Sequence, residues 1–191
     1  MAKKAIVLLA EGFEEVEAIT PVDYLRRAGV EVTTAAIGES RCVKGSRGIP
    51  VNADTILSAL VKEGKTDAVF WDAVIIPGGM PGASNLAASR ETGALLKEMT
   101  AAGKLVCAIC ASPAVVLAPL GLLSGKKFTC YPGMEEKVKD GTWSQDRVVV
   151  DGTIITSRGA GTAGSFAVTI IEKLLGEAEG KKIAESVLLV L

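Results

Sequence analysis

One cysteine stands where a buried strand meets a helix, and its position favours nucleophilic chemistry. The segment Lys104-Leu-Val-Cys-Ala-Ile-Cys110-Ala-Ser-Pro predicts a strand over Leu105–Ile109 that runs almost directly into a helix. Cys110 then occupies the sharp turn between them, as in a nucleophile elbow, although Ala108 and Ser112 replace the flanking glycines. Unpaired N–H groups at the helix start favour a thiolate, which is the nucleophilic and oxidisable form. The alternative is that Cys110 is one more small buried hydrophobic residue.

The other three cysteines give no comparable signal. Cys107 forms a C-x-x-C with Cys110, but it lies inside the predicted strand, where positions three apart point to opposite faces. We therefore assign Cys107 to the core, with a redox pair or half of a zinc site as the alternative. Cys42 and Cys130 have no assignment beyond ordinary thiols. Four cysteines in 191 residues do not make a disulfide scaffold.

The absence of histidine limits the acid–base chemistry available to this thiol. Ser-His-Asp and Cys-His catalysis cannot occur within the chain, nor can a zinc site that contains histidine. Glu17 is the best remaining candidate for proton transfer, because it lies close to the carboxyl end of the first predicted strand. A neighbouring thiolate would raise the pKa of Glu17. The adjacent Glu14 and Glu15 are interpreted as favourable partners of the helix dipole.

Two glycine-rich segments follow predicted strands. Pro77-Gly78-Gly79 carries bare N–H groups that would form an anion nest or half of an oxyanion hole, or simply a tight turn. Gly159–Gly164 matches the G-x-G-x-x-G pattern of dinucleotide-binding loops. The few residues after Gly164 have a helical pattern, so no second strand supplies the acidic residue that binds the ribose. We therefore expect no nucleotide cofactor.

Short apolar runs alternate with longer segments of helical period along the chain. This pattern predicts an α/β fold with a mostly parallel sheet and helices on both faces. The predicted strands are Ala5–Ala10, Val30–Ile37, Ala73–Ile76, Leu105–Ile109, Lys127–Cys130, Arg147–Val150 and Thr153–Thr156, with a separate hairpin over Cys42–Val51. The predicted helices are Glu14–Ala28, Gly82–Ala102, Ser112–Pro119, Met134–Lys139, Thr162–Leu175 and Gly180–Leu189. Ligands bind beyond the carboxyl ends of such strands, so the site is expected among the loops after Ala10, Ile76, Ile109 and Thr156.

The composition is that of a compact globular chain and argues against several partners. Lys plus Arg number 21 and Asp plus Glu 22, with no basic run longer than two, so we expect no nucleic-acid binding. No stretch approaches the ~20 apolar residues of a membrane span, and acidic residues follow the first apolar run at once. We therefore expect a cytoplasmic protein that does not bind membranes. Without repeats or linkers, residues 1–191 are predicted to form a single domain.

Five motifs follow one another along the chain. They are AEGFEEVE (Ala10–Glu17), PVDYLRRAGVEVT (Pro21–Thr33), PGG (Pro77–Gly79), AICASP (Ala108–Pro113) and TSRGAGT (Thr156–Thr162). Together they resemble the ThiJ/PfpI superfamily and, within it, the DJ-one/YajL branch that includes a parkinsonism-associated deglycase. The resemblance covers nearly the whole chain. It implies a flavodoxin-like three-layer sandwich and a homodimer.

The resemblance also implies roles for individual residues. Cys110 matches the family's oxidation-sensitive nucleophile, and Glu17 matches the buried, largely protonated glutamate that bonds its sulfur. Gly79 and Ala111 match the positions whose N–H groups form the oxyanion pocket. The pocket-lining positions that transfer less directly are Gly78, Arg47, Tyr131 and Arg158.

Two departures from the family pattern bear on the chemistry. Ala111 follows Cys110 where the protease branch has a histidine, so peptidase activity is not expected. Tyr131 occupies the position of a pocket histidine in animal members, so no histidine-assisted step is expected either.

By this resemblance, the expected function is cofactor-independent and metal-free glyoxalase or protein deglycase chemistry. The substrates would be methylglyoxal, glyoxal and early glycation adducts, with Cys110 attacking the aldehyde and Glu17 shuttling the proton. The alternative is an oxidative-stress sensor and redox-regulated chaperone for misfolded client proteins. In that role Cys110 would become a sulfinate stabilised by Glu17.

Overall fold

The centre of the molecule is a seven-stranded sheet. In the computed structural model, which describes residues 2–190, the strands lie in the order β10-β11-β7-β6-β1-β2-β5. Neighbouring strands are parallel except β10 and β11, which form an antiparallel hairpin. The strand bounds are β1 Lys4–Leu9, β2 Glu31–Ala36, β5 Thr55–Ile56, β6 Ala73–Ile76, β7 Leu105–Ile109, β10 Val148–Asp151 and β11 Ile154–Ser157.

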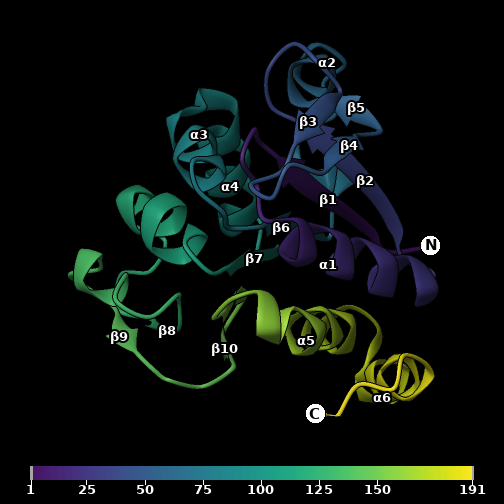
Figure 1. Ribbon diagram of the computed structural model, residues 1–191, viewed down its shortest axis with the longest axis vertical. Coiled ribbons are helices and arrows are strands. Elements are labelled where there is room, and N and C mark those ends of the chain that lie inside the picture. Colours follow the sequence, from purple (N-terminus) through teal and green to yellow (C-terminus); the bar gives the residue numbers. More distant parts are fainter. Residues whose placement is uncertain (1, 191) are drawn as a thin grey trace.

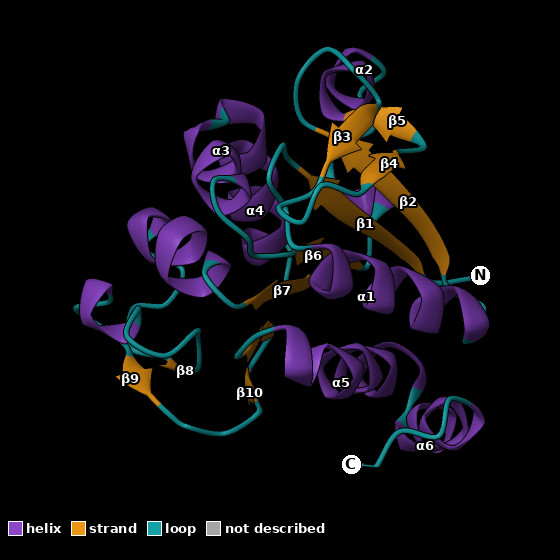
Figure 2. Ribbon diagram, viewed as in Figure 1, coloured by secondary structure: helices purple, strands orange, loops and turns teal. Residues whose placement is uncertain are grey.

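Helices cover both faces of this sheet. Helices α1 and α5 pack side by side on one face, and α3 and α4 cover the other (Figure 1). Figure 2 shows the strands as the layer between them. Among residues 2–190, no helix combines the length and the apolar character needed to cross a bilayer. The helix bounds are α1 Glu15–Arg27, α2 Leu57–Lys62, α3 Gly82–Ala88, α4 Arg90–Ala101, α5 Ala163–Leu175 and α6 Glu177–Ser186.

The central strands β6 and β7, and β1 after Lys4, are apolar because both of their faces are buried. In β1, Ile6 and Leu8 enter the core beneath α3 and α4, whereas Val7 and Leu9 enter the core beneath α1 and α5. Successive side chains of a strand point to opposite faces, so one apolar run supplies two cores. The predicted flavodoxin-like three-layer sandwich is confirmed.

Two small sheets lie outside the central one. The predicted hairpin over Cys42–Val51 forms from β3 (Cys42–Lys44) and β4 (Pro50–Asn52), which pair antiparallel. Strand β8 covers only Lys127–Phe128, and it pairs in parallel with β9 (Thr142–Trp143). The prediction of a strand over Lys127–Cys130 was therefore too long, and β9 was not predicted.

Two predicted helices are shorter or more irregular in the structure. The helix predicted over Ser112–Pro119 is a π-helical turn over Pro113–Leu117 followed by a 3₁₀ turn over Ala118–Leu120. Pro119 has no N–H to continue a regular ladder, which accounts for the change. The helix predicted over Met134–Lys139 is a single 3₁₀ turn. Strand β5 and helix α2 were not predicted, because two and six residues are too few to show a period.

Candidate active site

Cys110 lies on a strained turn at the carboxyl end of β7. Its φ is +64°, a left-handed conformation that residues other than glycine rarely adopt. Backbone bonds hold this turn on both sides, since the Cys110 N–H donates to Ser157 O (3.0 Å) and its carbonyl accepts from Tyr131 N (2.8 Å). The buried Ser112 hydroxyl donates to Pro77 O at 2.6 Å and ties the turn to the next loop. The surrounding structure therefore fixes where the thiol points.

Glu17 approaches this thiol from the first turn of α1. Its side chain is 1% exposed, and its Oε2 accepts the Gly78 N–H at 2.9 Å. The same carboxyl is hydrogen-bonded to the Cys110 side chain and to the Ala160 N–H. Gly78 leaves no room for a side chain here, because a Cβ would lie 2.6 Å from Cys110 Cβ and 2.7 Å from Glu17 Oε2. The close approach of loop, thiol and carboxyl depends on that glycine.

Burial controls the protonation of both groups. Burial, together with the charge of Glu14, raises the pKa of Glu17 to about 7, against the hydrogen bonds from Cys110, Gly78 and Ala160, which lower it. Burial also raises the pKa of Cys110 to about 12, together with the negative charge and the hydrogen bond of Glu17. Two negative charges in contact disfavour each other, so thiol and carboxyl lose their protons as a coupled pair.

The prediction of a thiolate stabilised by a helix start was therefore wrong in direction. The N–H groups of Gly79 and Ala111 do donate to the Cys110 sulfur and lower its pKa, but burial and Glu17 outweigh them. The helical segment that follows begins only at Pro113, as a short π-helical turn rather than a regular helix, which weakens the helix dipole at the thiol. At rest the pair holds a thiol beside a titrating carboxyl.

The thiol and the carboxyl open into a depression of about 470 Å³. Of the predicted site residues, the structure brings Glu17, Gly79, Cys110, Ala111 and Tyr131 together around it, and Arg47 joins them. Gly78 lies behind Glu17 instead of on the surface of the depression, and Arg158 lines a neighbouring one. Lining residues that sequence reasoning missed are Glu14, Ser46, Met80, Met134 and Ala160.

Glu15 has a different role from the predicted one. Its carboxylate accepts the N–H of Arg47 at 2.7 Å and the N–H of Ile49 at 3.3 Å. Burial alone would raise the pKa of Glu15, but these and the other hydrogen bonds to the carboxylate lower it overall. Glu15 therefore holds the loop between β3 and β4, which carries Arg47 to the edge of the depression. No local signal shows this, because the partners are more than 30 residues apart.

Glu14 was correctly placed at the start of a helix but plays a second part. Its side chain caps α1 by accepting the Glu17 N–H at 2.8 Å. It also lines the depression, where its charge acts on Glu17. Glu14 therefore both caps α1 and helps to raise the pKa of Glu17.

The remaining thiols lie outside the depression. Cys107 is buried in the core beneath α1 and α5, as predicted, and burial raises its pKa. Cys130 is buried in the opposite core, and Cys42 is exposed. All four cysteines are free, so Cys107 and Cys110 form no disulfide.

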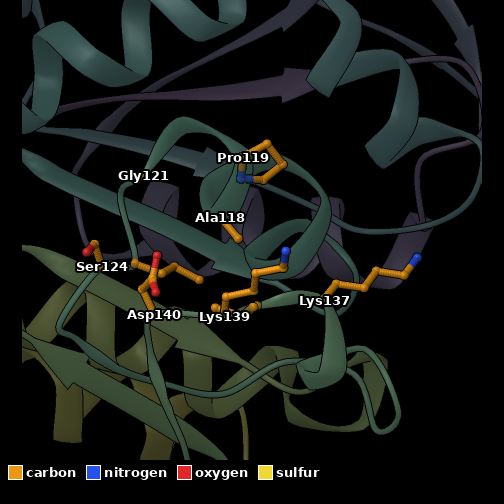
Figure 3. Close-up of a pocket in the computed structure, with 9 residues that line it drawn as sticks. Ala118, Pro119, Gly121, Ser124, Lys137, Lys139 and Asp140 are labelled. Carbon is orange, nitrogen blue, oxygen red and sulfur yellow. The ribbon is translucent and has the colours of Figure 1, made fainter.

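A second, smaller depression lies apart from this site. Its volume is about 200 Å³, and it lies between the segment of Ala118 and Pro119 and the segment of Lys137–Asp140 (Figure 3). None of its lining residues belongs to the candidate site. Within residues 2–190, no group of three or more His, Cys, Asp or Glu side chains is arranged to hold a metal ion.

Comparison with known proteins supports the assignment of this fold and its motifs. The model of the DJ-1/PfpI family matches residues 3–173. The chain belongs to the DJ-1/PfpI family. Protein dj-1beta of Drosophila melanogaster is 40% identical over 98% of both chains. The Parkinson disease protein 7 homolog of Danio rerio is 41% identical over 91% of this chain and 90% of its own. The resemblance inferred from the sequence is confirmed.

Solved DJ-1/PfpI structures superpose closely on this chain. The oxidized Toxoplasma gondii DJ-1 has a TM-score of 0.93 and 42% identity, with full coverage of both chains. Drosophila melanogaster DJ-1beta has a TM-score of 0.92 and 39% identity, covering all of both chains. Some family members are longer, since this chain spans only 40% of Protein DJ-1 homolog B of Arabidopsis thaliana, with 40% identity.

Proposed function

We propose that this protein converts reactive 2-oxoaldehydes to hydroxy acids without a cofactor, and acts on early glycation adducts by the same chemistry. The observation that carries the proposal is the hydrogen-bonded pair of Glu17 and Cys110, with Cys110 on a strained turn beside the N–H groups of Gly79 and Ala111. One relative, from Caenorhabditis elegans, is named "Glutathione-independent glyoxalase DJR-1.2" and is 38% identical over 91% of this chain.

The protonation of the pair suggests how the thiol is activated. With a pKa of about 7, the Glu17 carboxylate is matched to general-base work at neutral pH. It accepts the thiol proton as the Cys110 sulfur attacks the aldehyde carbon, so no free thiolate is needed at rest. The N–H groups that donate to the sulfur are placed to stabilise the oxyanion formed on the attacked carbon.

The remaining steps rearrange the adduct without an external oxidant. Glu17 first gives the thiol proton to the oxyanion, which forms a hemithioacetal and restores the carboxylate. The carboxylate then moves the proton from the former aldehyde carbon to the ketone carbon through an enediol, which leaves a thioester of a 2-hydroxy acid. Water then cleaves the thioester and restores the thiol, so methylglyoxal plus water gives lactate. Formation of lactate from methylglyoxal in the absence of glutathione tests the proposal, and loss of methylglyoxal without lactate would contradict it.

A second function is favoured by the same pair. Of the four cysteines, Cys110 alone combines partial exposure with a hydrogen-bonded carboxyl. A protonated Glu17 can donate a hydrogen bond to a sulfinate, and the sulfinate charge would keep that proton in place. We propose that Cys110 also reports oxidative stress, with binding of misfolded client proteins as the response. Four free thiols fit the reducing cytoplasm, where we place the protein.

Dilute peroxide is expected to add two oxygen atoms to Cys110 before the other thiols react to the same level. Mass spectrometry of the intact protein and its peptides measures this. E17Q should lower the yield of the two-oxygen form, because its amide cannot carry the shared proton. The exposed Cys42 is the internal control, and equal oxidation of Cys42 and Cys110 would contradict selective sensing.

We propose that the protein forms a homodimer through the outer side of α1. Val16 and Ile19 are 48% and 40% exposed, and their spacing of three places them on one helix face. Ile49, at 55% exposure, lies on the loop that Glu15 holds against the same helix. The variant V16D/I19D is expected to halve the mass measured by light scattering. V69D changes an apolar side chain that is 80% exposed elsewhere and should leave the mass unchanged.

A further inference from the structure

The neighbouring depression that Arg158 lines adjoins the one that contains the thiol. Its volume is about 520 Å³, and it shares Tyr131 and Ala160 with the first. Gly159 lies between them, since a Cβ there would be 3.6 Å from the Tyr131 ring and 3.8 Å from Glu17 Oε1. Gly159, Tyr131 and Ala160 therefore form the border between the two depressions. The further lining residues are Pro132, Arg147, Arg158, Gly161 and Thr162.

The two arginines of this depression are held in place but not neutralised. Arg147 Nη2 donates to Gly161 O at 3.2 Å, and Arg158 Nη1 donates to Gln145 O at 3.1 Å. Among residues 2–190, the arginines that form ion pairs are Arg26 and Arg27. A guanidinium has five N–H donors, so most donors of both side chains are available to a ligand. Guanidinium groups suit the paired oxygens of carboxylates and phosphates.

Charge is distributed unevenly over the two adjoining depressions. The thiol depression is lined by Glu14, Glu17 and a single arginine, Arg47, whereas the depression of Arg147 and Arg158 contains two arginines and no carboxylate. An anionic group would therefore be attracted more strongly to the depression of Arg147 and Arg158 than to the thiol end. A molecule with a carbonyl at one end and an anion at the other would therefore be oriented with its carbonyl toward Cys110.

We propose that Arg147 and Arg158 bind the anionic end of the substrate, so that the preferred substrates are 2-oxoaldehydes that carry a carboxylate or a phosphate. This inference rests on the proposed function of Cys110. A suitable probe is 4,5-dioxopentanoate, which takes up one water and becomes 2-hydroxyglutarate. Its aldehyde carbon is oxidised and its ketone carbon is reduced, so the reaction needs no other reactant.

The experiment compares kcat/KM for 4,5-dioxopentanoate with that for the uncharged 2-oxohexanal. The wild-type protein is expected to prefer the anionic substrate by about tenfold, and R147Q/R158Q should lose this preference. R147K/R158K keeps the charges without the forked donors and should retain part of the preference. R90Q removes an exposed positive charge from the start of α4 and should leave the preference unchanged. Thermal unfolding shows whether each variant is folded.

The outcomes separate this proposal from the proposed function. Equal kcat/KM for both substrates in the wild type would overturn the anion subsite and leave the thiol chemistry standing. Absence of turnover for both, and also for methylglyoxal, would overturn the proposed function; whenever neither probe is turned over, calorimetric titration decides the subsite. Binding of glutarate or inorganic phosphate that is lost in R147Q/R158Q supports it, and the tighter of the two identifies the anion type. No binding, or binding unchanged by the substitutions, overturns it.

Discussion

Replacing Cys110 with serine is expected to abolish conversion of methylglyoxal to lactate while the protein remains folded. A hydroxyl is a far weaker nucleophile than a thiol, and the Glu17 carboxylate is too weak a base to deprotonate it. We expect kcat/KM to fall by at least about 10³-fold, which corresponds to roughly 4 kcal/mol of transition-state stabilisation. Lactate formation measured against time with and without the substitution gives this ratio.

The matched control for this prediction is C42S. Cys42 is exposed on β3 and does not line the depression, so its replacement should leave turnover unchanged. Both Cys and Ser adopt the left-handed turn at position 110 with similar strain, so C110S should unfold at nearly the wild-type denaturant concentration. Substantial lactate formation by folded C110S would remove the thiol from the mechanism.

Replacing Glu17 with glutamine is expected to lower turnover and, at alkaline pH, to stabilise the fold. Without the carboxylate the thiol has no base, and a loss of about 10²- to 10⁴-fold in kcat/KM is typical of such a change. In the wild type, kcat/KM should rise with pH as Glu17 ionises near its pKa of about 7. In E17Q this rise should be absent. Turnover measured across the pH range tests both statements.

The effect on stability follows from the same proton. The folded state holds it up to about pH 7, whereas the unfolded chain releases it near the ordinary value of 4.5. The folded state therefore binds more protons between these values, and the free energy of unfolding falls as pH rises through them. The free energy of unfolding is expected to fall by about 3 kcal/mol over this range. In E17Q this fall should be absent, because the amide is neutral at every pH.

Urea unfolding at several pH values measures this difference, and E15Q provides a control of opposite sign. The pKa of Glu15 is lowered in the fold, so its contribution is present above the unfolded pKa and is lost as pH falls. E15Q should therefore be less stable than the wild type at neutral pH, with a smaller deficit in acid. An equal pH dependence of stability in E17Q and the wild type would mean that Glu17 is not the buried titrating group.

Much of the architecture could be predicted from local pattern alone. The apolar runs of β1, β6 and β7 are continuous because helices bury both faces of the parallel sheet. Asp151 and Gly152, between the predicted strands Arg147–Val150 and Thr153–Thr156, indicated the β10–β11 hairpin. The turn itself lies one residue further on, at Gly152 and Thr153, and Gly152 has the positive φ that such a turn requires. Irregular turns and strands of two residues were missed, because segments of that length show no period.

The residues of the candidate site could also be proposed from the sequence, but their protonation could not. Cys110 and Glu17 follow strands whose carboxyl ends meet at one edge of the sheet, so their proximity follows from the order of elements. The direction of the Cys110 pKa depends on burial and on the Glu17 charge, which are properties of the packed molecule. The contact of Glu15 with the loop of Arg47 likewise joins segments 32 residues apart, whereas Arg147 and Arg158 flank the paired ends of the β10–β11 hairpin. Local patterns set which groups the chain carries, and only tertiary packing decided their solvent exposure, charge and partners.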